Sequence, residues 1–219
     1  DADLVMGVPE SGIPAAEGYA RASSIPYGQG LVKNRYIGRT FIAPTQALRT
    51  AAVRMKLNPL RDNIEGQRLI VVDDSIVRGT TTRAMVRMLR DAGATEVHMR
   101  VSSPPYRWPC FYGMDTGTRG ELLAANLTVD EIREYLEVES LTYLRLDHLL
   151  EATGTVGAGF CDACLTGTYP IEIPVNLSKA VLEGPEGRSA PERTMPIQGD
   201  DGEAELPTAA ANRLFGRGS

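Results

Sequence analysis

The first hundred residues alternate short apolar runs with segments of helical periodicity. The apolar runs lie at Leu4 to Val8 and at Leu69 to Val72, and a third strand-like stretch, EVHMRVSS, covers residues 96–103. Helical periodicity is present near residues 13–22 and again near residues 45–56. Short strands that alternate with helices predict an α/β domain in which helices flank a mainly parallel sheet.

A further helical segment, near residues 81–92, has the clearest periodicity. Its apolar residues recur at spacings of three and four, which places them on one helix face. Gly93 follows directly and supplies a left-handed C-terminal cap. The segment IVVDDSIVRGTTT, residues 70–82, therefore lies between a strand and a helix. The residues of the apolar face are Ala84, Met85, Met88, Leu89 and Ala92.

Two other segments have weaker patterns. Residues 27–44 combine cationic residues, tyrosines and glycines without a helical face, and this predicts a mobile or partly hairpin-like loop. Residues 128–152 predict one or two helices. Thr128 and Glu131 have the spacing of a capping box, which predicts a helix that begins there.

The composition divides the chain into three parts. The α/β domain covers residues 1–127, and a helical, cysteine-containing segment follows at 128–177. Beyond it, residues 178–219 are rich in Gly, Pro, Ser and acidic residues, which cannot bury enough apolar surface to offset their ordering entropy. The sequence predicts a disordered tail there.

Length and charge exclude several classes of protein. The 219 residues suffice for one sizeable core with appendages. A formal net charge of -5 argues against a general nucleic-acid binder, which needs an excess of cations to neutralise phosphates. No apolar run approaches the roughly 20 residues that cross a bilayer.

The opening residues, DADLVMGVPESG, begin inside an apolar run. They include no initiator Met, no basic region and no long apolar region of the kind found in a secretory signal. We therefore expect the chain to be the C-terminal portion of a longer, cytoplasmic protein, with the opening strands of its first domain missing.

The polar residues 73–82, DDSIVRGTTT, lie at the predicted strand-to-helix turn, which is where ligands bind in open α/β sheets. Gly79 permits close approach of the backbone, and the amides and hydroxyls of Thr80 to Thr82 can surround an anion at the helix N-terminus. Asp73 and Asp74 can accept hydrogen bonds from sugar hydroxyls or bind Mg²⁺. The alternative is a helix-capping loop with solvated aspartates. A Walker A loop is excluded because no Gly-Lys-Ser/Thr is present.

The stretch VVDDSIVRGTTT resembles the binding motif of the type I phosphoribosyltransferases, in which an apolar strand leads to two acidic residues and a small-residue loop with threonines. The resemblance implies the fold of that family and phosphoribosyl pyrophosphate (PRPP) as ligand. The residues implied in PRPP binding from this motif are Asp73, Asp74, Ser75, Arg78, Gly79, Thr80, Thr81 and Thr82.

A second motif, PESG at residues 9–12, is similar to the pyrophosphate loop of the same family. The resemblance implies that Ser11 and Gly12 bind PRPP, and that Ser11 joins Asp73 and Asp74 around Mg²⁺. The family often has Asp where Glu10 stands.

The third motif is basic. Lys33, Arg35 and Arg39 resemble the family's flexible loop, which closes over the substrate. Lys33 and Arg35 are the expected catalytic residues, because cations beside the departing pyrophosphate stabilise the transition state more than the ground state. Closure also excludes water. The alternative is a solvated basic hairpin.

Three cysteines complete the set of candidate residues. Cys161 and Cys164 have the Cys-x-x-Cys spacing of metal or redox sites, and Cys110 stands apart in RWPCFYG. Structural zinc and iron–sulfur clusters usually take four ligands, so one ligand is missing. The alternative is that all three are inert thiols.

Taken together, these motifs resemble the glutamine PRPP amidotransferases over residues 1 to about 175. The cysteines resemble the branch with a [4Fe–4S] cluster, which implies a fourth ligand upstream of this chain. The family's N-terminal glutaminase, absent here, supplies ammonia that displaces pyrophosphate to give 5-phosphoribosylamine and glutamate. The resemblance also implies purine nucleotide inhibitors and a homotetramer.

Three other functions remain open at this point. The chain could be a nucleobase phosphoribosyltransferase, a PRPP-binding regulatory module without catalysis, or an electron-transfer iron–sulfur protein. Without its glutaminase, an amidotransferase fragment would be ammonia-dependent or inactive. Packing or surface roles are expected for His98, His148 and Trp108.

Overall fold

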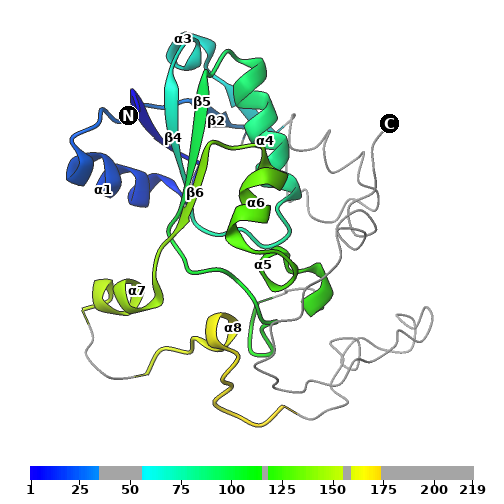
Figure 1. Cartoon of the computed structure of the whole chain (residues 1–219). Coiled ribbons are helices and arrows are strands. Elements are labelled where there is room, and N and C mark those ends of the chain that lie inside the picture. Colours follow the sequence, from blue (N-terminus) through cyan, green and yellow to red (C-terminus); the bar gives the residue numbers. More distant parts are fainter. Residues whose placement is uncertain (35–55, 115–117, 155–158, 174–219) are drawn as a thin grey trace, which may run out of the picture.

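The computed structural model describes residues 1–34, 56–114, 118–154 and 159–173 (Figure 1). Three of the predictions lie outside these ranges: the helix near 45–56 apart from its last residue, the cations Arg35 and Arg39, and the tail from residue 178. In the described part of the chain, no helix is both long and apolar enough to cross a membrane.

The main sheet has four parallel strands in the order β1-β4-β5-β6. Parallel neighbours need long crossover connections, and helices provide these between β1 and β4, between β4 and β5, and between β5 and β6. The predicted strands near 4–8, 69–72 and 96–103 are thereby confirmed. The strands are β1 (Leu4–Gly7), β4 (Arg68–Asp73), β5 (Glu96–Val101) and β6 (Ser140–Tyr143).

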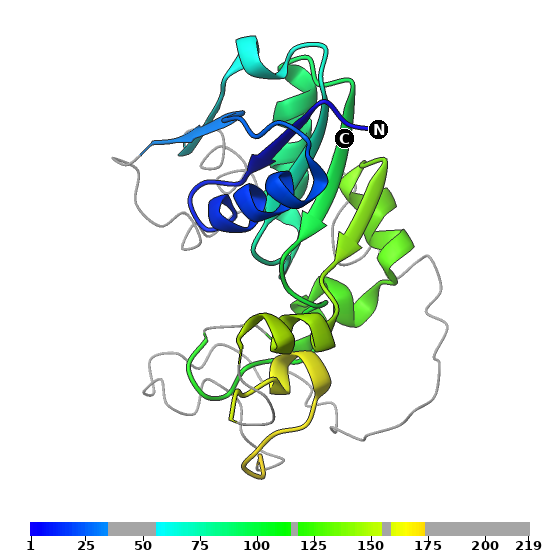
Figure 2. The same cartoon turned by 90° about the vertical axis from the view of Figure 1, so that its left-hand side faces the viewer.

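Helices cover both faces of the sheet (Figures 1 and 2). On one face α1 (Ile13–Ser23) packs on β1 and β4, and Ala16 and Ala20 are buried there. On the other face α4 (Thr80–Asp91) and α6 (Val129–Leu136) cover the larger apolar core. The helices predicted near residues 13–22 and 81–92 are confirmed as α1 and α4.

The remaining elements are short. A two-stranded antiparallel ribbon pairs β2 with β3, and it begins within the segment predicted to be a loop. Beyond the end at which the strands of the sheet finish, α7 and α8 lie in the lower part of the molecule (Figure 1). These elements are β2 (Leu31–Lys33), β3 (Leu57–Pro59), α3 (Arg61–Ile64), η2 (Arg119–Glu121), α5 (Leu123–Asn126), α7 (Leu146–Ala152) and α8 (Ala163–Thr166).

The segment 128–152 differs from the prediction. Its first helix, α6, begins with the predicted capping box of Thr128 and Glu131. The prediction of helices alone is wrong at the centre of the segment, because β6 extends the sheet beyond residue 127. The chain leaves α6 at Glu137, whose φ of 63° breaks the helix, and Leu141 then pairs with Met99 as a buried strand residue.

Candidate functional site

Two loops follow neighbouring strands of the sheet. The first loop, residues 8–12, leads from β1 into α1, and the second loop, residues 75–82, leads from the end of β4 into the first turn of α4. Gly7 pairs with Val72, and the Val8 N–H donates a hydrogen bond to the Val72 carbonyl oxygen at 2.9 Å. Parallel neighbouring strands therefore bring both predicted ligand loops to the same edge of the sheet.

The first loop lies unusually close to β4. A Cβ atom added at Gly12 would lie 2.3 Å from the Val72 carbonyl oxygen, so only glycine fits at this position. The Gly12 N–H donates to the Val8 carbonyl at 2.9 Å and closes the turn. Ser11, at the tip of the loop, is exposed, and its hydroxyl makes no hydrogen bond within the described residues.

The second loop presents a run of unused backbone donors. Among the described residues, none of the N–H groups from Ser75 to Thr82 donates to a protein acceptor. The hydroxyls of Thr80 and Thr81 likewise have no partner there, and no side chain caps α4. Unpaired amides at the positive end of a twelve-residue helix are suited to bind an anion.

Gly79 shapes this loop. Its φ is 71°, which favours glycine, and a Cβ there would lie 2.6 Å from Leu123 Cδ2. The loop thus turns through a conformation and a space that other residues do not fit.

Asp73 and Asp74 stand at the end of β4, directly before the second loop. Asp73 is half-buried, and burial raises its pKa to about 8, with a smaller contribution from the hydrogen bond and charge of Asp74. The Asp74 N–H donates to Asp73 Oδ1 at 2.9 Å, and Asp74 itself is exposed. The interpretation as a helix-capping loop with solvated aspartates does not fit, because neither carboxylate caps α4 and only Asp74 is exposed.

This acidic pair fits a divalent cation. Two neighbouring carboxylates supply closely spaced oxygen ligands of the kind that Mg²⁺ prefers. Ser11 lies at the same edge, although no hydrogen bond joins it to Asp73 or Asp74 in the described part of the chain. The structure therefore brings the three predicted Mg²⁺ ligands to one edge without joining Ser11 to the pair.

Lys33, at the end of β2, reaches the first loop. Its Nζ lies 3.1 Å from Glu10 Oε2, and the two side chains are 30% and 54% exposed. The ion pair therefore places the one described member of the predicted basic loop next to Ser11. Arg35 lies outside the described residues.

Arg78 contacts a residue that the sequence did not indicate. Its Nε donates to Glu121 Oε2 at 2.7 Å, and the Leu123 N–H donates to the Val77 carbonyl at 2.8 Å. Glu121 lies 43 residues from Arg78, and neither Glu121 nor Leu123 belongs to a motif, so no local pattern could have identified them.

The three cysteines lie in the lower part of the molecule. Cys110 and Cys164 are half-buried and Cys161 is exposed. Burial raises the pKa of the Cys164 thiol, and the nearby Cys110 and Cys161 raise it further. Within the described residues, however, no group of three or more His, Cys, Asp or Glu side chains is placed to hold a metal ion. Three thiols are also one fewer than the usual four ligands.

Neither histidine joins the two loops. His98 lies on β5, where its ring contacts Glu96 and Ser140, and His148 is exposed on α7.

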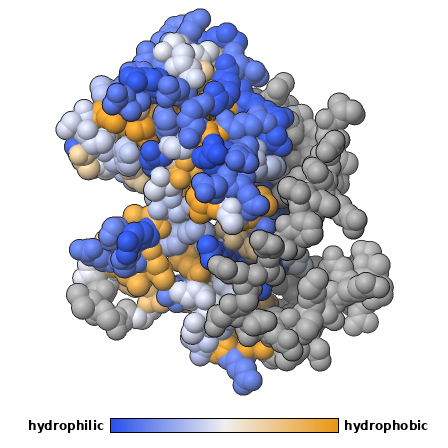
Figure 3. Space-filling model, in the orientation of Figure 1, coloured by the Kyte–Doolittle hydropathy of each residue, from blue (hydrophilic) through white to orange (hydrophobic). Residues whose placement is uncertain are grey.

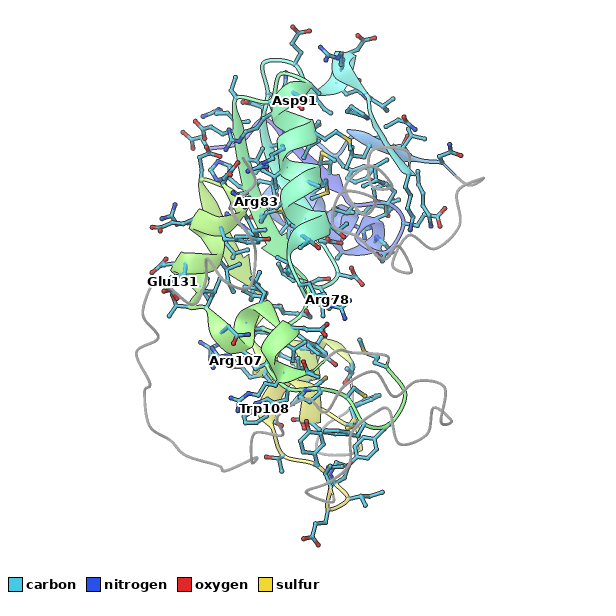
Figure 4. The ribbon with its side chains drawn as sticks, turned by 90° about the vertical axis from the view of Figure 1, so that its right-hand side faces the viewer. Arg78, Arg83, Asp91, Arg107, Trp108 and Glu131 are labelled. Atoms are coloured by element: carbon cyan, nitrogen blue, oxygen red, sulfur yellow. The ribbon has the colours of Figure 1, made fainter. Side chains whose placement is uncertain are left out.

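The surface is hollowed between the sheet and the lower part of the molecule (Figure 3). Arg78, in the second loop, lies on the side of the sheet that faces Arg107 and Trp108 (Figure 4).

Known proteins are similar to this chain along most of its length. The model of the phosphoribosyl transferase domain matches residues 1–103. An amidophosphoribosyltransferase of Synechocystis sp. is 62% identical over 185 residues, which cover 84% of this chain and 37% of the relative. An amidophosphoribosyltransferase of Synechococcus elongatus is 58% identical, with 84% and 38% covered. The chain thus spans less than two fifths of the length of these relatives.

Two solved structures are also similar. The allosteric regulatory enzyme of purine biosynthesis superposes with a TM-score of 0.71 at 54% identity, covering 80% of this chain and 39% of that one. The glutamine PRPP amidotransferase from B. subtilis, complexed with ADP and GMP, gives a TM-score of 0.72 at 53% identity, covering 81% and 40%.

Proposed function

We propose that this chain, which has the type I phosphoribosyltransferase fold, is the phosphoribosyltransferase portion of an amidophosphoribosyltransferase of purine biosynthesis. In the full-length enzyme, ammonia from an N-terminal glutaminase domain would react with PRPP to give 5-phosphoribosylamine and pyrophosphate, with glutamate as the other product. The observation that supports this most is the run of unused amides in the second loop beside an acidic pair.

Each part of PRPP would find a matching group at this candidate site. The amides of Ser75 to Thr82 would bind the 5-phosphate, with Arg78 beside them. Asp73 and Asp74 would accept hydrogen bonds from the ribose hydroxyls, and Ser11 and Gly12 would bind the pyrophosphate. Mg²⁺ held by Ser11, Asp73 and Asp74 would offset the negative charge of the pyrophosphate.

In the reaction, the bond between the anomeric carbon and the pyrophosphate oxygen breaks as the bond to nitrogen forms. The attacking ammonia then loses one proton, and pyrophosphate departs with the bonding electron pair. Lys33 would exchange its ion pair with Glu10 for one with the pyrophosphate. A positive charge there stabilises the transition state most, because negative charge develops on the pyrophosphate as the bond breaks. Arg35 would act in the same way. Neutral ammonia needs positioning more than a strong base.

The proposal also covers the other groups of the enzyme. Cys110, Cys161 and Cys164 would supply three ligands of a structural [4Fe–4S] cluster, with the fourth from outside this chain. Their mutual effect on the Cys164 pKa supports a shared location. We expect purine nucleotides to inhibit a cytoplasmic homotetramer.

The test measures pyrophosphate released from PRPP by the chain with ammonium and Mg²⁺. Asp74→Asn should lower the rate about 100-fold, and Asp62→Asn, an exposed acidic residue on α3, should not. If the chain is inactive, calorimetry with Mg²⁺ and PRPP tests the proposal by measuring the heat of PRPP binding.

Other outcomes would contradict the proposal. Pyrophosphate release that requires a purine base rather than ammonia would identify a nucleobase phosphoribosyltransferase. Binding heat without turnover, in a full-length enzyme, would identify a regulatory module. No heat at all would reject PRPP as the ligand.

A further inference from the structure

A short segment that follows β5 in the sequence packs against the second loop and supports it. The supporting segment, residues 119–126, consists of η2 and α5. Glu121 accepts the hydrogen bond from Arg78, and the backbone N–H of Leu123 donates to the Val77 carbonyl. The Leu123 side chain fills the space beside Gly79 and is 1% exposed. Three consecutive residues of the second loop are therefore fixed by one segment.

The supporting segment is internally rigid. The Asn126 side-chain Nδ2 donates to the carbonyl oxygens of Leu122 at 2.7 Å, Gly120 at 3.1 Å and Arg119 at 3.4 Å. A single amide thus closes the η2 turn. Arg119 and Glu121 therefore lie at the two ends of one closed turn.

The other end of the supporting segment contacts Trp108. The Arg119 guanidinium carbon lies 3.8 Å from the centroid of the Trp108 ring, within the range of a cation–π interaction. A Cβ at Gly167, which caps α8, would lie 2.6 Å from Trp108 Cε2, so the indole ring packs directly against the end of α8. The backbone N–H of Trp108 donates to the Cys164 carbonyl oxygen at 3.1 Å.

These contacts form a continuous connection from the cysteine-bearing α8 to the second loop. Its exposed ion pair adds little to folding stability, because the Arg78 and Glu121 side chains are 40% and 47% exposed. A fixed orientation of Arg78 is the effect that this geometry can supply.

We propose that Glu121 and Arg119 are positioning residues for PRPP binding, which act through Arg78 and Trp108, so that the second loop and the region of Trp108 are energetically coupled. The proposal rests on the proposed function for its choice of ligand. Coupling acts in both directions: if PRPP binding changes the surroundings of Trp108, then a substitution that alters those surroundings should also alter PRPP affinity.

The chain offers a direct probe, since Trp108 is its single tryptophan. Mg²⁺ and PRPP added to the full chain should change the Trp108 fluorescence. Glu121→Gln should suppress this change and weaken PRPP binding about 3- to 10-fold, the size expected for coupling between contiguous side chains. Glu134→Gln is the matched control, because it removes an exposed ion pair with Arg133, and neither side chain bonds to the second loop in the described part of the chain. That variant should keep both the fluorescence change and the affinity.

Two further variants test the route. Arg119→Met, which removes the charge over the indole ring, should weaken PRPP binding by a factor similar to that of Glu121→Gln without lowering the melting temperature. In an Arg78→Ala background, Glu121→Gln should have no further effect on affinity, because it acts through Arg78. Additive effects of Glu121→Gln and Arg78→Ala would overturn the proposal.

The outcomes separate this proposal from the proposed function. Binding heat with an unchanged Trp108 fluorescence would overturn the coupling and leave the function intact. No binding heat would reject the function. In that case acrylamide quenching of ligand-free protein decides the coupling: quenching of Trp108 should increase equally in Glu121→Gln and Arg78→Ala and stay unchanged in Glu134→Gln. Unchanged quenching in all three variants would overturn it.

Discussion

At the scale of single residues, Gly79 determines how the second loop turns into α4. Gly66 has nearly the same φ, 75° against 71°, but nothing lies within 4 Å of a Cβ added there. The two glycines therefore separate the cost of the left-handed backbone from the cost of contact with Leu123.

Alanine at either position should destabilise the fold, but by different amounts. Gly66→Ala should cost about 1–2 kcal/mol for the left-handed conformation. Gly79→Ala should cost about 1–3 kcal/mol more because of overpacking against Leu123, and it should abolish PRPP binding. Urea denaturation and calorimetry measure both effects. Equal losses of stability in the two variants would show that the contact with Leu123 has no cost.

Asp73 offers a test of the electrostatics of the site. Its pKa of about 8 lies above the ordinary value of 3.8, so the folded chain binds a proton more tightly than the unfolded chain. The contribution of Asp73 to stability is therefore greatest below pH 3.8 and declines as the pH rises towards 8.

Asp73→Asn should consequently stabilise the ligand-free chain while it prevents binding of Mg²⁺ and PRPP. At pH 8 in the absence of Mg²⁺, the gain should be about 1–3 kcal/mol, which is the size of the desolvation penalty of one polar group. Denaturation from pH 4 to pH 9 measures this, and the gain should grow with pH. A variant that is less stable than the original chain at pH 8 would contradict the prediction.

At the scale of elements, Glu137 joins the end of α6 to α4. Its carboxylate accepts hydrogen bonds from Arg83 at 2.6 Å and from Arg87 at 2.8 Å and 3.2 Å (Figure 4 labels Arg83). These hydrogen bonds, with Arg87 contributing most, lower the Glu137 pKa to about 2.

The stabilisation by Glu137 should depend on pH with the opposite sign to that of Asp73. It is fully present above the ordinary pKa of 4.5 and is lost as the pH falls towards 2. Glu137→Gln should cost about 1 kcal/mol at pH 7, because the side chain is 41% exposed and partly screened. The difference from the original chain should shrink as the pH falls from 4.5 and disappear below about pH 2 in denaturation curves. A difference that stays constant with pH would exclude a role for the charge.

Periodicity predicted the elements that have a strong pattern of their own. The apolar face of α4 and the capping box of α6 are both present as predicted. The strand β6 was missed because its short sequence, SLTY, lies between two helical patterns and becomes a strand only by pairing with β5. Tertiary pairing decided the structure there, and periodicity could not reveal it.

In the candidate site, too, local sequence predicted some residues, and tertiary packing determined the others. Asp73 and Gly79 follow a strand directly, so local order in the sequence places them at the sheet edge. The ion pair of Lys33 with Glu10 and that of Arg78 with Glu121 join residues 23 and 43 positions apart. Such pairs follow from the way that whole elements pack, which no single motif records.

At the scale of the whole molecule, PRPP should stabilise the fold. At a concentration one hundred times the dissociation constant, a ligand that binds only the folded chain adds about 2.7 kcal/mol. For a chain of this length that corresponds to a rise of about 5–10 °C in melting temperature. Differential scanning calorimetry with PRPP and Mg²⁺ measures the shift, and chelation of Mg²⁺ should remove most of it. An equal shift without Mg²⁺ would argue against a metal-assisted site.

The first loop is held against the end of β4, directly before the second loop. The Val8–Val72 hydrogen bond holds it there, together with the close approach of Gly12 to the same carbonyl oxygen. The distance between the two loops is consequently fixed, and the site should not adapt to a shorter or longer ligand. Ribose 5-phosphate and free pyrophosphate would each reach only one of the two loops. Only a molecule that joins both at the right length gains the advantage of a tethered second contact.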